Sequence, residues 1–141
     1  MKKLLFILFL IIVCIPAYSQ KADTIIGSGN NIKAHVYYFH ITNRCNTCRG
    51  IEAKTIKTLD SLFSEQFKNG TLVFSSYNCE LKENESLVKK YDAYGATLAI
   101  TIFKDGKEIK TEDLTNWAFE KTNKSDVFII ELSEKLHEIL K

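Results

Sequence analysis

Cys45 and Cys48 are the residues whose type and spacing most directly support chemistry in this chain. They frame the run Cys45-Asn46-Thr47-Cys48, which follows an apolar strand-like run and precedes a run with helical spacing. At a helix start, the first cysteine exposes its sulfur to the partly positive helix N-terminus, which stabilises a thiolate. The spacing therefore predicts a reversible disulfide, with Cys45 as the nucleophile and Cys48 as the resolving thiol.

Neighbouring side chains could assist such a dithiol. Arg44 and Arg49 flank the pair, and a nearby cation favours a thiolate, although both arginines could equally be solvated charges. His40 lies five residues before Cys45 and could assist proton transfer, or it could be structural. His35 and His137 are expected at the surface.

Cys79 leaves three alternatives open. It is a third redox thiol that accepts the disulfide from the Cys45 and Cys48 pair, a third metal ligand, or a small apolar residue at a strand end. In the metal-binding alternative, Cys45, Cys48, Cys79 and His40 would hold zinc, another soft metal or trivalent arsenic.

The N-terminal residues have the pattern of an export signal. Lys2 and Lys3 precede an apolar run from Leu4 to Ile15, and Ala17-Tyr18-Ser19 offers a cleavage site. We expect a signal peptide at 1–19, cleaved before Gln20, and an exported protein, periplasmic or secreted, with no membrane span after cleavage. An uncleaved anchor and a lipid-modified Cys14 are the alternatives.

Composition narrows the possible functions further. Lys2 and Lys3 account for the whole net charge of +2, so no excess of positive charge in the rest of the chain argues for nucleic acid. No G-x-G-x-x-G motif follows a strand, so no flavin or nicotinamide cofactor is expected, and the cysteine pair is the only redox group. Apolar residues spread along 34–141 predict one domain, after a flexible linker at 20–33.

Periodicity predicts the elements that position the dithiol. Asp105-Gly106 between two strand-like runs is a hairpin signal, and Asn69-Gly70 ends the first helix. The expected elements are strand 34–41, helix 51–67, strand 71–77, helix 80–91, hairpin strands 96–103 and 108–110, a polar connection holding Trp117 and Phe119, and a helix that Ser125 caps.

This order predicts an α/β fold with a mixed central sheet flanked by helices. The helical connection between the first two strands implies a right-handed crossover and parallel pairing, whereas the hairpin makes the last pair antiparallel. Sites gather at the carboxyl ends of parallel strands, where Cys45, Cys48 and Cys79 all fall.

The element order, with Tyr94-Gly95 and the run from Phe103 to Lys107, resembles the thioredoxin-like superfamily over roughly 34–141. The resemblance implies a three-layer fold and thiol-disulfide exchange. The chain departs from that pattern where thioredoxins carry a cis-proline facing the dithiol, because Pro16 is its only proline and Thr97 occupies the approximate place. Arg44 also replaces a tryptophan, and Asn46-Thr47 replaces Gly-Pro.

A narrower resemblance is to the exported ArsF family, described as a subunit of a nitrophenyl compound nitroreductase. Val36 to His40, then Arg44-Cys45-x-x-Cys48 and Ile51-Glu52, carry this resemblance. It implies electron transfer to an aromatic nitro group, with the redox cofactor located elsewhere.

Two functions from different classes follow. The first is an exported thiol-disulfide oxidoreductase or electron-transfer module that meets a protein redox partner at the dithiol. The second is a non-catalytic module that uses the same thiols to bind a soft metal, a metalloid or a partner. The sequence leaves the direction of electron flow and the oligomeric state open.

Overall fold

Strand β2 (Ala34–His40) lies in the middle of the sheet, as its nearly continuous apolarity predicts. The computed structural model describes residues 20–141, so the expected signal peptide at 1–19 lies outside the described residues. β2 pairs in parallel with β3 (Leu72–Asn78) and antiparallel with β4 (Thr97–Lys104). The predicted parallel pairing of the first two strands is therefore confirmed, and so is the hairpin, because β4 pairs antiparallel with β5 (Lys107–Asp113).

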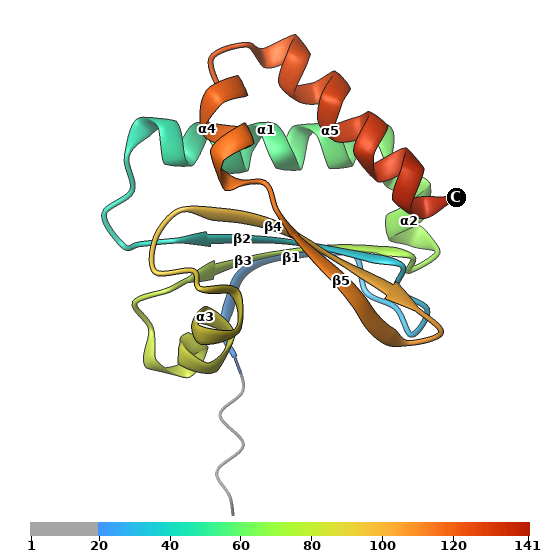
Figure 1. The fold of residues 1–141 in the computed structure, drawn as a ribbon, viewed down its shortest axis with the longest axis horizontal. Helices are drawn as coiled ribbons and strands as arrows, with labels where there is room; N and C mark the ends of the chain where they lie inside the picture. Colours follow the sequence, from blue (N-terminus) through green and yellow to red (C-terminus); the bar gives the residue numbers. More distant parts are fainter. Residues whose placement is uncertain (1–19) are drawn as a thin grey trace, which may run out of the picture.

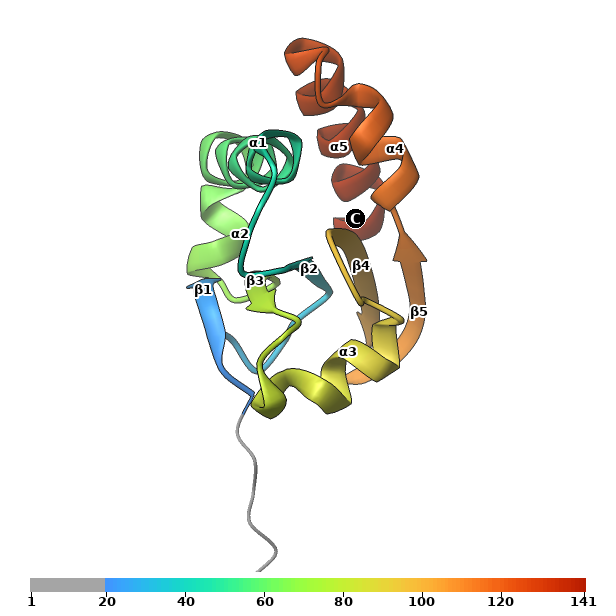
Figure 2. The same ribbon diagram turned by 90° about the vertical axis from the view of Figure 1, so that its left-hand side faces the viewer.

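The molecule has three layers (Figures 1 and 2). A five-stranded mixed sheet in the order β1-β3-β2-β4-β5 forms the middle layer, with β1 (Ala22–Ile26) and β5 at its edges. One face carries most of the helices, and the opposite face carries α3 (Glu85–Tyr91). This arrangement is an α/β, thioredoxin-like three-layer fold. The helices on the first face are α1 (Asn46–Leu62), α2 (Ser64–Lys68), α4 (Thr115–Lys121) and α5 (Ser125–Leu140).

Side chains alternate between two apolar clusters along β2. Val36 and Tyr38 point to the larger cluster, between the sheet and the helices α1 and α5. Tyr37 and Phe39 point to the smaller one, beside α3. Because both faces of β2 are covered, its carboxyl end is held in one position, and the loop that carries the dithiol starts from a rigid support.

Residues 20–33 are not a flexible linker throughout, and this expectation was wrong. Ala22–Ile26 form strand β1, which pairs antiparallel with the edge of β3. Beyond it, the backbones of Gly29 and Gly70 touch, since a Cβ added at Gly29 would lie 2.5 Å from the Gly70 oxygen. The strand was missed because five residues of modest apolarity form a strand only against the β3 edge, which supplies their partners.

The helices differ from the prediction in detail. The helix starts at the dithiol as expected, but the run 51–67 is interrupted at the buried Phe63, which separates α1 from α2. The expected helix 80–91 begins with a short 3-10 turn, Lys82–Asn84. Ser125 is the first residue of α5 rather than its cap, because Lys124 occupies the N-cap without a side-chain bond.

The stretch expected as a polar connection contains helix α4. Trp117 packs against Phe128 with their rings 4.7 Å apart, and its Nε1 donates to Glu131 Oε2 at 2.6 Å. Trp117 therefore closes the layer between α4 and α5. Within residues 20–141, no helix is both long and apolar enough to cross a membrane.

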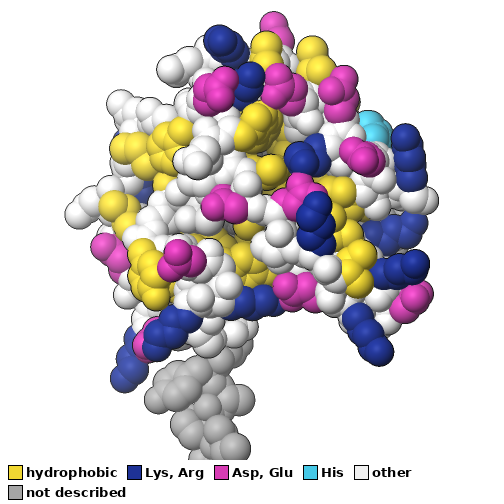
Figure 3. Space-filling model, in the orientation of Figure 1, with side chains coloured by type: hydrophobic (Ala, Val, Ile, Leu, Met, Phe, Trp, Pro, Cys, Tyr) yellow, Lys and Arg dark blue, Asp and Glu magenta, His cyan; other side chains and the backbone are white. Residues whose placement is uncertain are grey.

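The second hairpin strand, β5 (Lys107–Asp113), is an exposed edge of the sheet. Its acidic side chains form ion pairs. Glu108 pairs with Lys90 of α3, and Glu112 pairs with both Lys110 of β5 and Lys135 of α5. Acidic and basic side chains are likewise interspersed over the face shown in Figure 3. Charges along an edge strand oppose its pairing with a further strand.

Candidate active site

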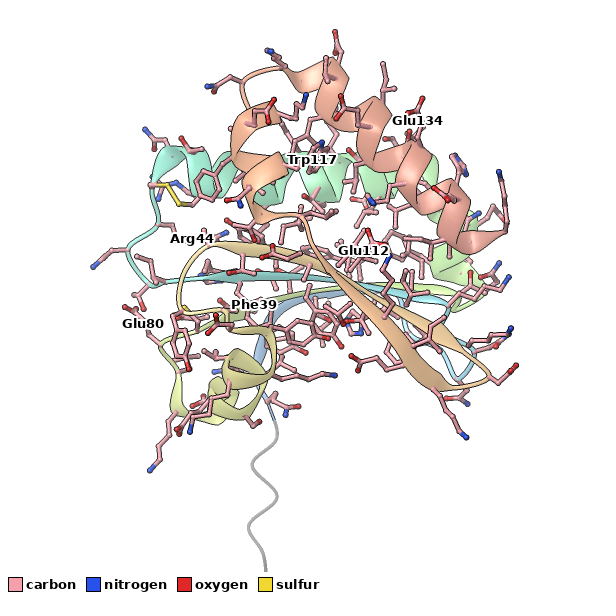
Figure 4. The ribbon with its side chains drawn as sticks, in the orientation of Figure 1. Phe39, Arg44, Glu80, Glu112, Trp117 and Glu134 are labelled. Carbon is pink, nitrogen blue, oxygen red and sulfur yellow. A yellow bond between two sulfur atoms is a disulfide. The ribbon has the colours of Figure 1, made fainter. Side chains whose placement is uncertain are left out.

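The dithiol lies where the β2 loop enters helix α1, and it is oxidised in this structure. Cys45 and Cys48 form a disulfide with their Cα atoms 5.1 Å apart, visible as the yellow bond at the start of α1 in Figure 4. Cys45 has extended backbone angles and is the N-cap of α1, and its Sγ accepts a hydrogen bond from the Cys48 N–H at 3.0 Å. The first sulfur therefore occupies the place of a capping side chain.

Exposure separates the two sulfur-bearing residues. Cys45 is exposed and Cys48 is half-buried. A thiolate on Cys45 would keep the backbone N–H of Cys48 as a donor and would face the positive end of α1, whereas burial disfavours a thiolate on Cys48. No acidic residue in the first turn of α1 opposes the charge. The arrangement suits attack by Cys45 and resolution by Cys48.

Arg44, predicted as an auxiliary residue, is held away from solvent. Its guanidinium pairs with Glu52 on α1, and its Cζ lies 5.6 Å from the centre of the Tyr38 ring. Tyr38 in turn donates its hydroxyl to the Cys48 carbonyl at 2.6 Å, and burial raises the pKa of Tyr38 to about 12. Figure 4 labels Arg44 next to the loop that leads to the disulfide.

Arg49 behaves differently from Arg44. It is exposed, and its Nη2 donates to Asn46 Oδ1 at 2.9 Å across the first turn of α1. The two arginines that flank the dithiol are therefore not equivalent, since one is buried against a carboxylate and the other is solvated.

His40, the candidate for proton transfer, is buried and faces acceptors on both ring nitrogens. Nδ1 lies 3.0 Å from the Ile41 carbonyl oxygen. Nε2 lies 2.8 Å from Asp23 Oδ2 of strand β1, at ion-pair distance but without hydrogen-bond alignment. These neighbours tie the end of β2 to β1.

Cys79 follows β3, and its side chain joins the smaller apolar cluster with Leu87 and Tyr91. It is a free thiol, and burial raises its pKa above the usual value. Its N–H donates to the His40 carbonyl at 2.8 Å, so the two loops meet through the backbone. No three His, Cys, Asp or Glu side chains among residues 20–141 are placed to hold a metal ion, so the proposed ligands Cys45, Cys48, Cys79 and His40 are not brought together as a site.

Thr97 begins β4 and pairs in register with Phe39 of β2. Its hydroxyl donates to the Gly95 carbonyl at 3.3 Å, which holds the turn that enters the strand. The peptide bonds of the described residues are all trans, Thr97 included. Tyr94, in the same turn, is exposed.

Tyr38, Glu52 and Asp23 are side chains of this region whose roles the sequence did not reveal. From the sequence, Tyr38 is expected to pack in the core as part of an apolar strand, and Glu52 is expected to be one solvated charge of a helix. Only the loop geometry brings Tyr38 and Glu52 to Arg44 and Cys48, and only the pairing of β1 brings Asp23 to His40. The one available signal was the spacing of Glu52, four residues after Cys48, which places it one helical turn away.

Comparisons with known proteins add little to this geometry. No family model and no curated protein matches the chain. A solved structure described as "Structure of a malarial protein" is similar over 63% of this chain and 94% of its own, with 17% identity and a TM-score of 0.39. Similarity at this level assigns neither a family nor a function.

The class of protein follows from the fold and the site together. A Cys-x-x-Cys pair at disulfide distance, placed at a helix start on a thioredoxin-like fold, fits a thiol-redox module.

Proposed function

We propose that this protein is a thiol-disulfide oxidoreductase or electron-transfer module that cycles Cys45 and Cys48 between disulfide and dithiol. The observation that carries the proposal is the Cys45 sulfur at the N-cap of α1, within hydrogen-bond distance of the Cys48 N–H. The helix N-terminus stabilises a thiolate at this position, and the exposure of Cys45 lets a partner reach the sulfur.

The cycle transfers two electrons in two exchange steps. In the reduced form, the Cys45 thiolate attacks a partner disulfide, forms a mixed disulfide and releases one partner thiolate. Cys48, deprotonated, then attacks the Cys45 sulfur and releases the second partner thiolate, which leaves the Cys45–Cys48 disulfide. Both partner thiolates take up protons as they leave. The same steps run backwards when the partner is a dithiol.

The setting we propose is outside the cytoplasmic membrane, in the periplasm or secreted, with a protein partner at the dithiol. The support is the signal-like pattern of 1–19 and the ArsF resemblance around the dithiol. The second of these suggests a subunit of a nitroreductase system, in which this chain exchanges electrons with a subunit that holds the cofactor. No observation favours the metal- or metalloid-binding alternative.

Equilibration with glutathione buffers of defined potential tests the redox cycle. After alkylation, mass spectrometry should show the peptide with Cys45 and Cys48 either doubly alkylated or unalkylated and two hydrogen atoms lighter than the dithiol, with a single two-electron transition between the two forms. Cys79→Ser should leave this transition unchanged. Thiols of Cys45 and Cys48 that stay alkylatable in the most oxidising buffer would contradict the proposal.

Trapping tests the roles of the two cysteines. Cys48→Ser should hold a mixed disulfide between Cys45 and a disulfide-bearing partner, because the resolving thiol is gone, and Cys45→Ser should hold none. The readout is a reducible mass increase on a gel of envelope extract incubated with each protein. An adduct that disappears with Cys79→Ser but persists with Cys45→Ser would assign the attack to Cys79 instead.

A further inference from the structure

Two opposite charges lie partly buried beside the dithiol, and the exchange steps above do not use either. The Arg44 side chain is 19% exposed and the Glu52 side chain 13% exposed, and the two form an ion pair. The Arg44 Nε is buried without a hydrogen-bond partner. Desolvating both ions, with one donor left unmet, costs free energy, so the pair is weak evidence for a role in stability alone.

Along the sequence, Arg44 and Glu52 lie on either side of the dithiol. Arg44 immediately precedes Cys45, and Glu52 follows Cys48 by one turn of α1. Tyr38 contacts Arg44 and Cys48, because its ring lies under the guanidinium and its hydroxyl binds the Cys48 carbonyl. Both charges are thus fixed in place relative to the Cys45 sulfur by contacts that do not depend on the disulfide.

Buried charges act on a neighbouring thiol more strongly than solvated ones. A cation nearby favours a thiolate and an anion disfavours it, and partial burial reduces the screening of both effects. Arg44 and Glu52 therefore act on Cys45 with opposite signs. Arg49 of α1 is exposed and bound to Asn46, so its effect on the thiol is weaker.

We propose that the partly buried Arg44–Glu52 pair positions the dithiol loop and sets the reactivity of Cys45, with Arg44 promoting the thiolate and Glu52 limiting that effect. The biological use of this setting rests on the proposed function, in which Cys45 is the attacking thiol. A thiol poised in this way reacts with a partner disulfide without becoming a poor nucleophile, since nucleophilicity falls as the thiol becomes more acidic.

Other charges near this end of the molecule have partners of their own or project from the surface. Lys121 of α4 pairs with Glu120 and Glu131, and His40 faces Asp23. Three further charged groups of this region are Arg49 at Asn46, Lys54 beside Gly50, and Glu80, whose carboxylate accepts from the Thr42 N–H.

The test measures the pH dependence of Cys45 alkylation by iodoacetamide in a Cys48→Ser background, so that a single thiol is followed in its own peptide. Glu52→Gln should move the midpoint to lower pH and Arg44→Gln should move it to higher pH, each by about one pH unit. The double variant Arg44→Gln with Glu52→Gln should return close to the starting midpoint.

Controls separate charge from simple structural damage. Arg49→Gln should move the midpoint little, and Arg44→Lys should keep it near the original value because the charge remains. These two proteins and the double variant leave no lone buried charge, so they stay informative where a single variant fails to fold. Single variants that shift in the same direction, or a double variant displaced by about a full pH unit, would overturn the proposal.

This result is independent of whether a redox partner exists. The sign pattern of the alkylation midpoints can hold while the glutathione titration shows no transition, which would reject the proposed function alone. A normal transition with no opposition between the Glu52 and Arg44 variants would reject the charge-setting role alone.

Discussion

At the residue scale, the Cys45–Cys48 disulfide and the Arg44–Glu52 ion pair lie together at the start of α1. The disulfide was predictable from the local pattern Cys45-x-x-Cys48, because both cysteines lie at the first turn of one helix. Arg44 and Glu52 meet through a loop whose path depends on β2 and on Tyr38, so no local pattern contains their contact. The same limit applies to His40 and Asp23, which lie on different strands.

His35 shows the same limit and leads to a prediction. Expected at the surface, it instead stacks on Tyr37 with ring centres 3.8 Å apart, and its Nε2 lies 2.9 Å from Ser75 Oγ. Burial, with a smaller effect of Lys90, lowers the pKa of His35 to about 4, from 6.5.

Because the unfolded state binds a proton at higher pH than the folded state does, the free energy of unfolding should fall as pH drops from 6.5 towards about 4. The full contribution is on the order of 3 kcal/mol. Urea denaturation at several pH values should show a shallower pH dependence for His35→Gln than for the parent. His137→Gln, which changes an exposed histidine, should follow the parent, and an unchanged slope in His35→Gln would contradict the assignment.

At the element scale, a helix or strand was predictable where the pattern of its own residues is enough to specify it. β2, β3 and the Asp105-Gly106 hairpin were predictable from apolar runs and a turn that accepts positive φ. β1 and α4 were missed because their stability comes from neighbours: β1 needs the edge of β3, and α4 needs α5 and the start of β4. Phe63 divides α1 from α2 for a similar reason, since its burial in the core takes precedence over helical continuity.

One buried side chain, Asn84, adds to the backbone pairing that attaches β1 to the sheet. Asn84, fully buried, accepts from the Lys21 N–H at 2.8 Å and donates to the Lys21 carbonyl at 3.1 Å and the Asn78 carbonyl at 2.9 Å. Asn84→Ala should lower the free energy of unfolding by about 2 kcal/mol, because buried partners lose their hydrogen bonds.

Hydrogen exchange should locate that loss, with faster exchange concentrated in the peptide that contains β1. Asn31→Ala, at an exposed position, serves as the matched control and should change neither quantity. Equal acceleration across the sheet would show that Asn84 supports the whole domain rather than this strand.

At the scale of the whole molecule, the fold does not rely on its disulfide. The bond spans three residues in sequence at the edge of the larger core, and that core is formed by Phe63, Phe74, Leu132 and their neighbours. Closing so short a loop restricts the unfolded chain by only about 2 kcal/mol in the chain-entropy account.

The reduced protein should therefore remain folded, with a Tm lower by roughly 5–10 °C. Thermal unfolding followed by circular dichroism with and without reductant measures this difference. A Cys45→Ala, Cys48→Ala variant should melt close to the reduced protein. Loss of cooperative unfolding on reduction would instead make the disulfide a structural bond and count against a redox cycle.

The strand order also governs the speed of folding. β1 pairs with β3 in contacts such as Ala22 with Tyr77, far apart along the chain, whereas the β4–β5 hairpin joins Lys104 to Lys107. Hairpins close in about 1–10 μs, but distant strands must first bring a long loop together. Residues 20–141 contain no proline, so no slow prolyl isomerisation delays them. Pairing of the distant strands, β2 with β4 and β1 with β3, is therefore expected to limit the folding rate, and the hairpin is expected to form first.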